Sequence, residues 1–465
     1  MYGTIGITLV LIVMLMAPPS AADVKPHALI SDGAVLQQGM AAPIWGKAGD
    51  GERVTVRFQD QEVSTTASHG RWMVRLKPLR PGGPFTMTIS GENTIELHNI
   101  LVGEVWVCSG QSNMRHQVYQ SENPEQVTAA SKDPMLRLFD VPQADMPPDE
   151  LKASWQECGP DTVAGFSAVG YFFGRELRKA LRAPVGLICS AVGATPAEAW
   201  TSLRALRDKS ELHSIVENPE KDLRRPACLY NGMIAPLQPY AIRGVIWYQG
   251  EANTGRAYQY RTLFPTMIQN WREDWGQGDF PFLFVQLAPY GTDDPNRPYP
   301  FWAELREAQL FTSLRVPNTA MAVITDLGDP KEIHPKPKGP VGTRLALAAR
   351  AIAYGERIVY SGPIFEKMQI KGDCAILSFK HVGSGLAAKD GELKGFTVTG
   401  DDGKFVNAQA VIQGKNVVVW STEVPHPAAV RYGWANCPAV NLFNKEGLPA
   451  SPFRTDDFPM VTGQR

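Results

Sequence analysis

The chain has 465 residues, of which 44% are hydrophobic and 20% are charged. This composition is typical of a folded globular protein and excludes an intrinsically disordered or a membrane-embedded chain. The formal net charge of −1 shows no excess of positive charge, so nucleic acid is not an expected partner.

The first 22 residues have the features of a signal peptide. Ile5 to Ala17 form an apolar run that is too short for a bilayer, which needs about 20 residues. Small residues follow, and we expect cleavage after Ala22. The sequence therefore predicts a secreted or periplasmic protein with no membrane span in the mature chain. The alternative is a buried first strand or helix.

Residues 23–100 are expected to form an N-terminal β module. Short alternating runs such as Arg53–Phe58 and Thr86–Ile89 are separated by turn clusters at Gly49–Gly51 and Pro81–Pro84. This pattern of short alternating runs and turns is typical of antiparallel strands in a small β-sandwich.

Residues 101–354 have a different pattern, in which buried strands alternate with helices. The predicted strands are apolar runs without alternation, at Val105–Cys108, Val185–Cys189, Val245–Tyr248, Phe282–Val285 and Met321–Ile324. The predicted helices begin after Ser167, a good N-cap, and near Tyr258, Trp302 and Val341. The alternation predicts a parallel α/β sheet, which binds ligands at the carboxyl ends of its strands.

Residues 355–465 return to short β-like runs, such as Asn416–Trp420, and are expected to form a C-terminal β module. The six cysteines show no metal-ligand spacing. Cys108 and Cys189 are expected to be buried thiols, whereas Cys374 and Cys437 are candidates for a disulfide within the C-terminal module.

The candidate nucleophile and base both follow predicted strands of the α/β region. Ser112 lies in the segment Ser109–Met114, which directly follows the first of these strands and contains Gly110 to allow a tight turn. A serine needs a base, and His334 follows the last predicted strand in a loop rich in carboxylates. Taken singly, Ser112 is more often a loop hydrogen bonder, and His334 a surface histidine.

Two further turns supply candidate oxyanion donors. Gly193 follows the strand that ends at Cys189, and Asn253 follows the strand that ends at Tyr248. The backbone N–H of Gly193, the side-chain amide of Asn253 and the N–H of Ser112 would together form an oxyanion hole. The alternatives are an ordinary turn glycine and a helix N-cap.

Ser, Gly, Asn and His occur here in the block order of SGNH hydrolases, and the surrounding residues resemble one family. Gly103–Met114, Trp247–Asn253 and Ile333–Pro335 are similar to blocks of the sialate O-acetylesterase family, and the likeness covers nearly the whole mature chain. The resemblance implies an α/β fold, with a three-layer, flavodoxin-like SGNH hydrolase domain between the two β-sandwich-like modules.

The resemblance also implies an activity. The family removes O-acetyl groups from carbohydrates, including O-acetylated sialic acids and acetylated xylan, without a metal or an organic cofactor. By this likeness, Ser112 is the nucleophile, His334 the base, and Gly193 and Asn253 are oxyanion donors.

The third member of the triad is open. Many SGNH enzymes have an Asp three residues before the histidine, where this chain has Lys331. Glu332 is the preferred substitute, with Asp329, Asp326 or a Ser–His dyad as alternatives.

Four residues in or beside these blocks are expected to contact the substrate, namely Gln111, Arg115, Gln249 and Glu251. Arg115 or Arg256 would suit the carboxylate of a sialic acid, whereas acetylated xylan needs no such cation. The alternative to an esterase is a non-catalytic glycan-binding protein, which would have no need for a nucleophile, a base and two oxyanion donors.

Overall fold

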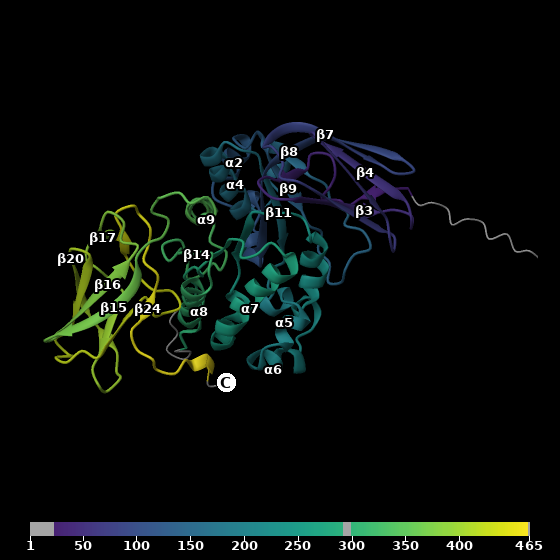
Figure 1. The fold of residues 1–465 in the computed structure, drawn as a ribbon. Helices are drawn as coiled ribbons and strands as arrows, with labels where there is room; N and C mark the ends of the chain where they lie inside the picture. The colour runs from purple at the N-terminus through teal and green to yellow at the C-terminus, as the bar shows by residue number, and fades with distance from the viewer. Residues whose placement is uncertain (1–22, 292–298, 464–465) are drawn as a thin grey trace, which may run out of the picture.

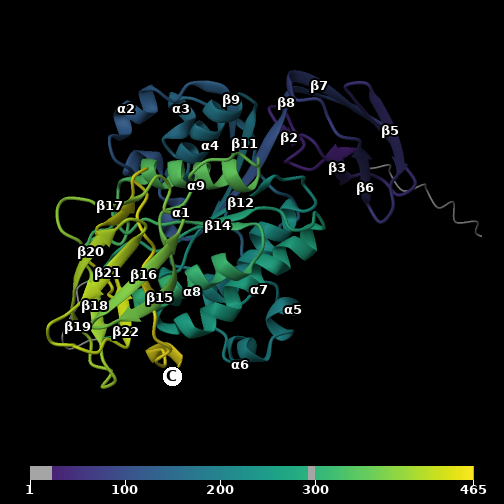
Figure 2. The same cartoon turned by 60° about the vertical axis from the view of Figure 1, so that its left-hand side comes forward.

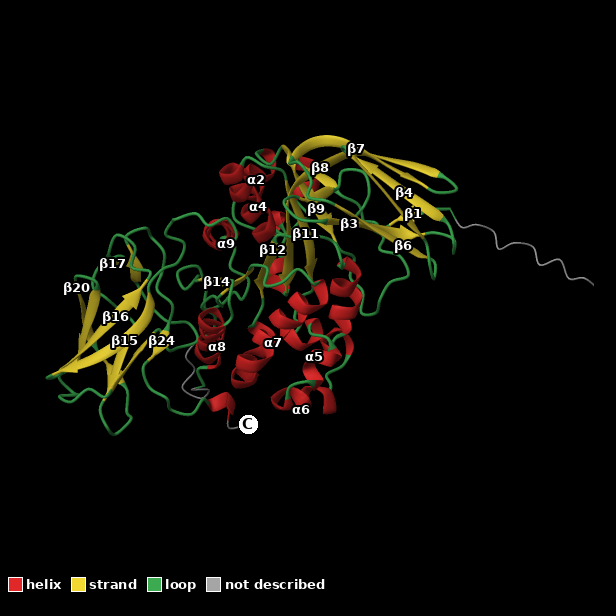
Figure 3. Ribbon diagram, in the orientation of Figure 1, coloured by secondary structure: helices red, strands yellow, loops and turns green. Residues whose placement is uncertain are grey.

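The computed structural model describes residues 23–291 and 299–463, so the predicted signal peptide lies outside the described residues. Three regions follow one another along the chain (Figure 1). Antiparallel strands at the N-terminus adjoin a central sheet flanked by helices, and a second group of antiparallel strands lies at the other side of the helical region (Figure 3).

The central sheet is parallel except at one edge. Its strand order is β10-β9-β11-β8-β12-β13-β14, and only β10 pairs antiparallel with its neighbour. The strands are β8 (Thr94–Gly110), β9 (Asp133–Asp140), β10 (Gln156–Cys158), β11 (Val185–Ala191), β12 (Gly244–Tyr248), β13 (Phe282–Val285) and β14 (Thr319–Ala322).

Each predicted strand and helix of the α/β region has a counterpart here, with ends that differ by a few residues. The helices are α1 (Ser112–Arg115), α2 (Pro124–Ala129), α3 (Pro160–Val163), α4 (Ala168–Leu181), α5 (Leu203–Arg207), α6 (His213–Glu217), α7 (Ala257–Trp275), α8 (Phe301–Arg315) and α9 (Lys338–Ile352). The α4 and α9 helices pack together on one side of the sheet, and α7 and α8 on the other (Figure 2). Ser167 caps α4 as expected, because its side chain accepts the Gly170 N–H.

The N-terminal region joins the central sheet through one long strand. β8 crosses the boundary predicted at residue 100, pairing with β7 and β2 in its first part and with β11 and β12 in its second. The other N-terminal strands are β1 (Lys25–Pro26), β2 (Val35–Gln37), β3 (Ala42–Lys47), β4 (Arg53–Phe58), β5 (Gln61–Thr66), β6 (Arg71–Leu76) and β7 (Gly82–Ser90). The apolar core is accordingly continuous between the two regions.

The C-terminal strands surround a separate apolar core. They are β15 (Ile364–Lys371), β16 (Cys374–Lys380), β17 (Leu386–Ala388), β18 (Phe396–Thr399), β19 (Val406–Asn407), β20 (Gln409–Gln413), β21 (Asn416–Trp420), β22 (Ala429–Tyr432), β23 (Leu442–Asn444) and β24 (Phe453–Arg454). This region is fixed to the helices by an ion pair from Arg454 to Glu307 at 2.7 Å. A buried hydrogen bond also joins Gln286 to the Ser451 hydroxyl at 2.9 Å.

Two expectations about cysteines have different outcomes. Cys108 and Cys189 are buried thiols on neighbouring strands, as predicted. The suggested disulfide between Cys374 and Cys437 is not present, because Cys374 is a free thiol that donates a hydrogen bond to Asp373 at 3.3 Å.

Candidate active site

Ser112 lies two residues beyond the carboxyl end of β8. The chain passes very close to β12 at Gly110, where a Cβ would overlap the Tyr248 carbonyl oxygen and where φ is +135°. Only glycine fits such a position without strain. The close approach turns the chain sharply, so that half-buried Ser112 begins the short helix α1 at the edge of the sheet.

Gly193 faces Ser112 from the next strand. β11 lies beside β8 in parallel register, with Ala191 opposite Gly110, so the turn after β11 comes to the same edge. A Cβ placed on Gly193 would lie 3.5 Å from the Ser112 Cβ. The absence of a side chain therefore leaves open the space directly beside the serine.

His334 and Glu332 lie together in the loop between β14 and α9. The Glu332 carboxylate accepts the His334 backbone N–H at 2.8 Å and lies 3.3 Å from the ring nitrogen Nδ1. The hydrogen bond from that N–H lowers the pKa of Glu332 below its ordinary value. The loop thus makes the turn that Glu332 needs to reach a ring two residues away.

The other two carboxylates proposed for the third position have different partners. Asp326 forms a two-pronged ion pair with Arg344, with both distances 2.7 Å. Asp329 accepts the Lys331 N–H at 2.7 Å. Of the three candidates, Glu332 is therefore the one that contacts the histidine ring.

Ser112, Gly193, His334 and Glu332 line one open cavity of about 840 Å³. A cavity of this size suits a small ligand or one part of a polymer. Its walls also include Arg115, His116, Tyr119, Glu122 and Lys336. The residues predicted separately from different strand ends therefore meet at one surface.

A buried polar network connects the serine side of the cavity to the histidine side. Asn113, next to Ser112, donates from Nδ2 to Glu251 at 2.6 Å and to the Ile333 carbonyl oxygen at 3.0 Å. Its Oδ1 accepts a hydrogen bond from Lys338 Nζ at 2.5 Å. Burial lowers the pKa of Lys338 to about 7 and raises that of Glu251.

His116 is a second histidine in this cavity. Its ring stacks on His334 with centroids 6.1 Å apart, and its Nε2 lies 3.1 Å from the Gln120 carbonyl oxygen. Burial lowers the pKa of His116 to about 4, so its ring is neutral near pH 7. A neutral ring can pack against His334 without opposing the positive charge that a general base acquires.

The sequence did not single out Asn113, Lys338 or His116, although each stands within four residues of a predicted catalytic residue. Asn113 adjoins Ser112 and Lys338 begins α9, so proximity in sequence was a usable signal. The burial of these side chains could not be predicted, because polar residues beside a loop are usually exposed to solvent.

Asn253 is buried, and its amide already has several partners. Its Oδ1 accepts the Ala197 N–H at 2.9 Å, and its Nδ2 donates to Glu198 at 3.0 Å. Asn253 is not among the described residues that line the cavity. Its role as an oxyanion donor stays a prediction and requires the second N–H of Nδ2.

Three of the expected substrate contacts bond to other parts of the protein, and none of them is among the described residues that line the cavity. Gln249 is fully buried and bonds to Asn253, Tyr260 and the Thr195 carbonyl oxygen. Gln111 is also buried, and its Oε1 accepts the Ala252 N–H at 3.2 Å. Glu251 belongs to the network around Asn113. This geometry gives these three side chains intramolecular partners and no contact with the cavity.

The two arginines considered for a sialic acid carboxylate are both paired with acidic residues. Arg115 lines the cavity but forms an ion pair with Asp140. Arg256 pairs with buried Glu198 and lies 3.6 Å from Glu220. Lys336 also lines the cavity, and no ion pair of its side chain is found among residues 23–291 and 299–463.

Within the described residues, no cluster of three or more His, Cys, Asp and Glu side chains is arranged to hold a metal ion. In the same part of the chain, every helix is too short or too polar to cross a bilayer.

Comparison with known proteins identifies the family. Residues 102–351, which include Ser112 and His334, match the carbohydrate esterase family described as sialic acid-specific acetylesterase. The chain belongs to this family. It is therefore a carboxylic ester hydrolase that removes O-acetyl groups from carbohydrates, which disfavours the glycan-binding alternative.

Relatives extend the match over most of this esterase. Human sialate O-acetylesterase is 33% identical over 91% of this chain and 91% of its own length. The mouse sialate O-acetylesterase is 34% identical over 73% of this chain and 75% of its own. A crystal structure of a carbohydrate acetylesterase from Xanthomonas citri is 40% identical, with a TM-score of 0.87, and covers 94% of this chain and 100% of its own. The mixed α/β fold therefore agrees with that of a solved carbohydrate esterase.

Proposed function

We propose that Ser112 is the nucleophile of an SGNH-type esterase and that His334, oriented by Glu332, is its base. The observation that carries this assignment is the meeting of Ser112, Gly193 and His334 in one cavity, with Glu332 against the far nitrogen of the histidine ring. A carboxylate at Nδ1 holds the ring so that Nε2 is the nitrogen left to face the serine.

The proposed reaction has two steps. The Ser112 hydroxyl attacks the acetyl carbonyl carbon while His334 accepts its proton. The tetrahedral intermediate then expels the sugar oxygen, which takes the proton from His334 and leaves as a hydroxyl. Water, activated by the same histidine, hydrolyses the acetyl-serine and releases acetate. The N–H groups of Ser112 and Gly193, together with Asn253, would hold the negative oxygen, and each such donor contributes about 2.7–4 kcal/mol.

The acetylated sugar is an O-acetylated sialic acid or an acetylated xylan-type glycan. A sialic acid carries a carboxylate, which Arg115 or Lys336 at the cavity wall can attract. Arg115 already contacts Asp140, so Lys336 is the cation better placed to bind an incoming anion. We also propose that residues 1–22 direct secretion or export to the periplasm.

Acetate release tests both the chemistry and the sugar. The protein beginning at Asp23 is incubated with O-acetylated sialic acid and with acetylated xylan, and Ser112→Ala serves as the control. Release by the wild type alone supports the proposal, and the faster substrate identifies the sugar class. Equal release by the two proteins would refute the assignment of Ser112.

A further inference from the structure

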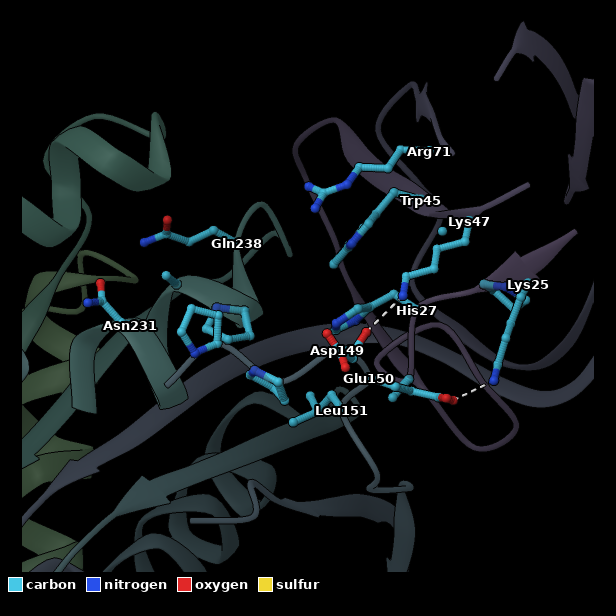
Figure 4. Close-up of a pocket in the computed structure, with 17 residues that line it drawn as sticks. Lys25, His27, Trp45, Lys47, Arg71, Asp149, Glu150, Leu151, Asn231 and Gln238 are labelled. Carbon is cyan, nitrogen blue, oxygen red and sulfur yellow. Dashed lines mark hydrogen bonds and ion pairs between the residues drawn. The ribbon is translucent and has the colours of Figure 1, made fainter. Parts of the chain in front are cut away.

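A second cavity lies between the N-terminal strands and the helical region (Figure 4). Its volume is about 460 Å³, and none of its described lining residues also lines the cavity that contains Ser112. Its walls combine residues of β1 and β3, the segment from Pro147 to Leu151, and the residues around Asn231 and Gln238.

One face of the N-terminal sheet supplies an aromatic wall. Trp45 and Lys47 are two residues apart on β3, so both side chains point to the same side of the sheet. Arg71 of β6 is directly opposite Lys47 in the antiparallel register and joins them on that side. Figure 4 shows these side chains on the side of the cavity across from Asn231 and Gln238.

The aromatic wall carries no charge of its own near neutral pH. The His27 ring stacks on Trp45 with centroids 4.8 Å apart and an angle of 22° between the ring planes. Burial lowers the pKa of His27 to about 4, so the imidazole stays neutral at pH 7. The stacking occupies one face of each ring, so the uncharged pair lies at the cavity wall as an aromatic surface, and pyranose rings bind to exposed aromatic faces through their C–H groups.

The cations around this wall are incompletely neutralised. Three cations, Lys25, Lys47 and Arg71, line the cavity with two carboxylates, those of Asp149 and Glu150. Glu150 forms an ion pair with Lys25 at 2.5 Å and also attracts Lys47, which donates to the backbone carbonyl of Asp149 at 2.8 Å. Exposed Arg71 makes no side-chain hydrogen bond or ion pair within the described ranges. Its planar guanidinium is the donor that best matches a carboxylate, since it can form two parallel hydrogen bonds.

We propose that this cavity is an accessory sugar site, in which Trp45 stacks on a pyranose ring and Arg71 binds the carboxylate of that ring. The ligand is an acidic sugar unit of the glycan that the esterase deacetylates, so the choice of sugar as the ligand rests on the proposed function. Uronic acids and sialic acids share this chemistry. The site would hold a polymeric substrate at a distance from Ser112 and leave small acetyl esters unaffected.

Binding of unacetylated oligosaccharides tests the site without any need for catalysis. Calorimetric titration of the protein beginning at Asp23 compares a neutral xylo-oligosaccharide, the same oligosaccharide bearing glucuronate, and a sialylated lactose. We expect at least one acidic ligand to bind more tightly than the neutral one. We also expect Arg71→Gln and Trp45→Ala each to weaken that binding roughly tenfold or more.

Two controls keep the test specific. Arg75→Gln removes an exposed arginine from the same face of β6, outside the cavity, and should leave binding unchanged. Trp45 packs partly against the core, so Trp45→Phe, which keeps an aromatic face, should retain most of the binding that Trp45→Ala loses. Equal affinity for neutral and acidic ligands, or unchanged binding in Arg71→Gln, would overturn the inference.

Hydrolysis of a small aryl acetate separates this inference from the proposed function. All the cavity variants should hydrolyse it at the wild-type rate, because they do not touch the residues around Ser112. If the wild type itself does not hydrolyse it, the esterase assignment fails. If the wild type hydrolyses it but no acidic ligand depends on Arg71, only the accessory site fails.

Discussion

The Nζ atom of Lys338 donates a hydrogen bond to the Oδ1 atom of Asn113 at 2.5 Å, inside the protein. Asn113 follows Ser112 directly, and its Nδ2 donates to the carbonyl of Ile333, the residue before His334. One asparagine therefore joins the backbone of the nucleophile to the loop of the base, and the lysine fixes the orientation of its amide. Lys338 positions the catalytic groups without touching the substrate.

Replacing Lys338 with methionine should lower kcat about tenfold or more, with a smaller change in KM. The variant keeps the volume of the side chain but leaves the Asn113 amide free to rotate. Steady-state kinetics on an aryl acetate measures the effect. Lys331→Met, which removes an exposed lysine from the same loop, should behave like the wild type. An unchanged kcat in Lys338→Met would contradict the positioning role.

The same variant has an expected signature in the pH dependence of stability. Burial lowers the pKa of Lys338 from 10.5 in an unfolded chain to about 7. Between these two values the unfolded chain binds a proton that the folded chain has lost, so this group makes the free energy of unfolding increase with pH. Urea denaturation from pH 7 to 10 should therefore show the difference between wild type and Lys338→Met growing in favour of the wild type. Parallel profiles would contradict the lowered pKa.

Glu332→Gln should lower kcat on the order of a hundredfold, because an amide no longer stabilises the charged imidazole or fixes its tautomer. The expected loss is less than that of a buried triad aspartate, since the Glu332 side chain is 52% exposed and water can partly replace it. Rates measured against pH on an aryl acetate report the change. Asp329→Asn in the same loop is the matched control and should leave kcat unchanged.

Asp326→Asn separates stability from catalysis in this loop. It breaks a largely buried ion pair with Arg344, and we expect a loss of about 3–5 kcal/mol in the free energy of unfolding. Under conditions where the variant is folded, its kcat should stay near the wild-type value. A specific loss of kcat without destabilisation would instead assign Asp326 to the third position.

Gly193→Ala should reduce kcat/KM at least tenfold while leaving the thermal midpoint nearly unchanged. The new methyl group would lie 3.5 Å from the Ser112 Cβ, in the space that a tetrahedral intermediate needs. Gly255→Ala is the matched control, since a Cβ there meets no atom within 4 Å. Equal activity in both variants would remove Gly193 from the oxyanion site.

The sequence predicted the strands and helices of the central region because apolar periodicity is a local signal. β9 was not predicted, because Arg137 interrupts its apolar run. The structure buries that arginine, whose Nε donates to the Pro134 carbonyl at 2.8 Å and whose second guanidinium nitrogen donates to Asn99 at 2.9 Å. The contact with Asn99, which is 38 residues away in the chain, has no local pattern in the sequence.

The positions of the candidate site residues could also be predicted from the sequence, but their contacts could not. Parallel strands bring their carboxyl ends to one edge, so the convergence of Ser112, Gly193 and His334 followed from their positions after strands. The burial of individual side chains could not be predicted from these positions. Gln249 and Glu251 have the chemistry of substrate ligands, but the turn after β12 folds them inward, where Tyr260 and Asn113 bond to them.

The most direct test of the central claim is to trap the acetyl-enzyme. The protein is mixed with an activated aryl acetate and quenched in acid, and its peptides are analysed by mass spectrometry. We predict one added acetyl group on the peptide that contains Ser112, located on that serine, and none in Ser112→Ala. An acetyl group on another residue, or undiminished turnover by folded Ser112→Ala, would contradict Ser112 as the nucleophile.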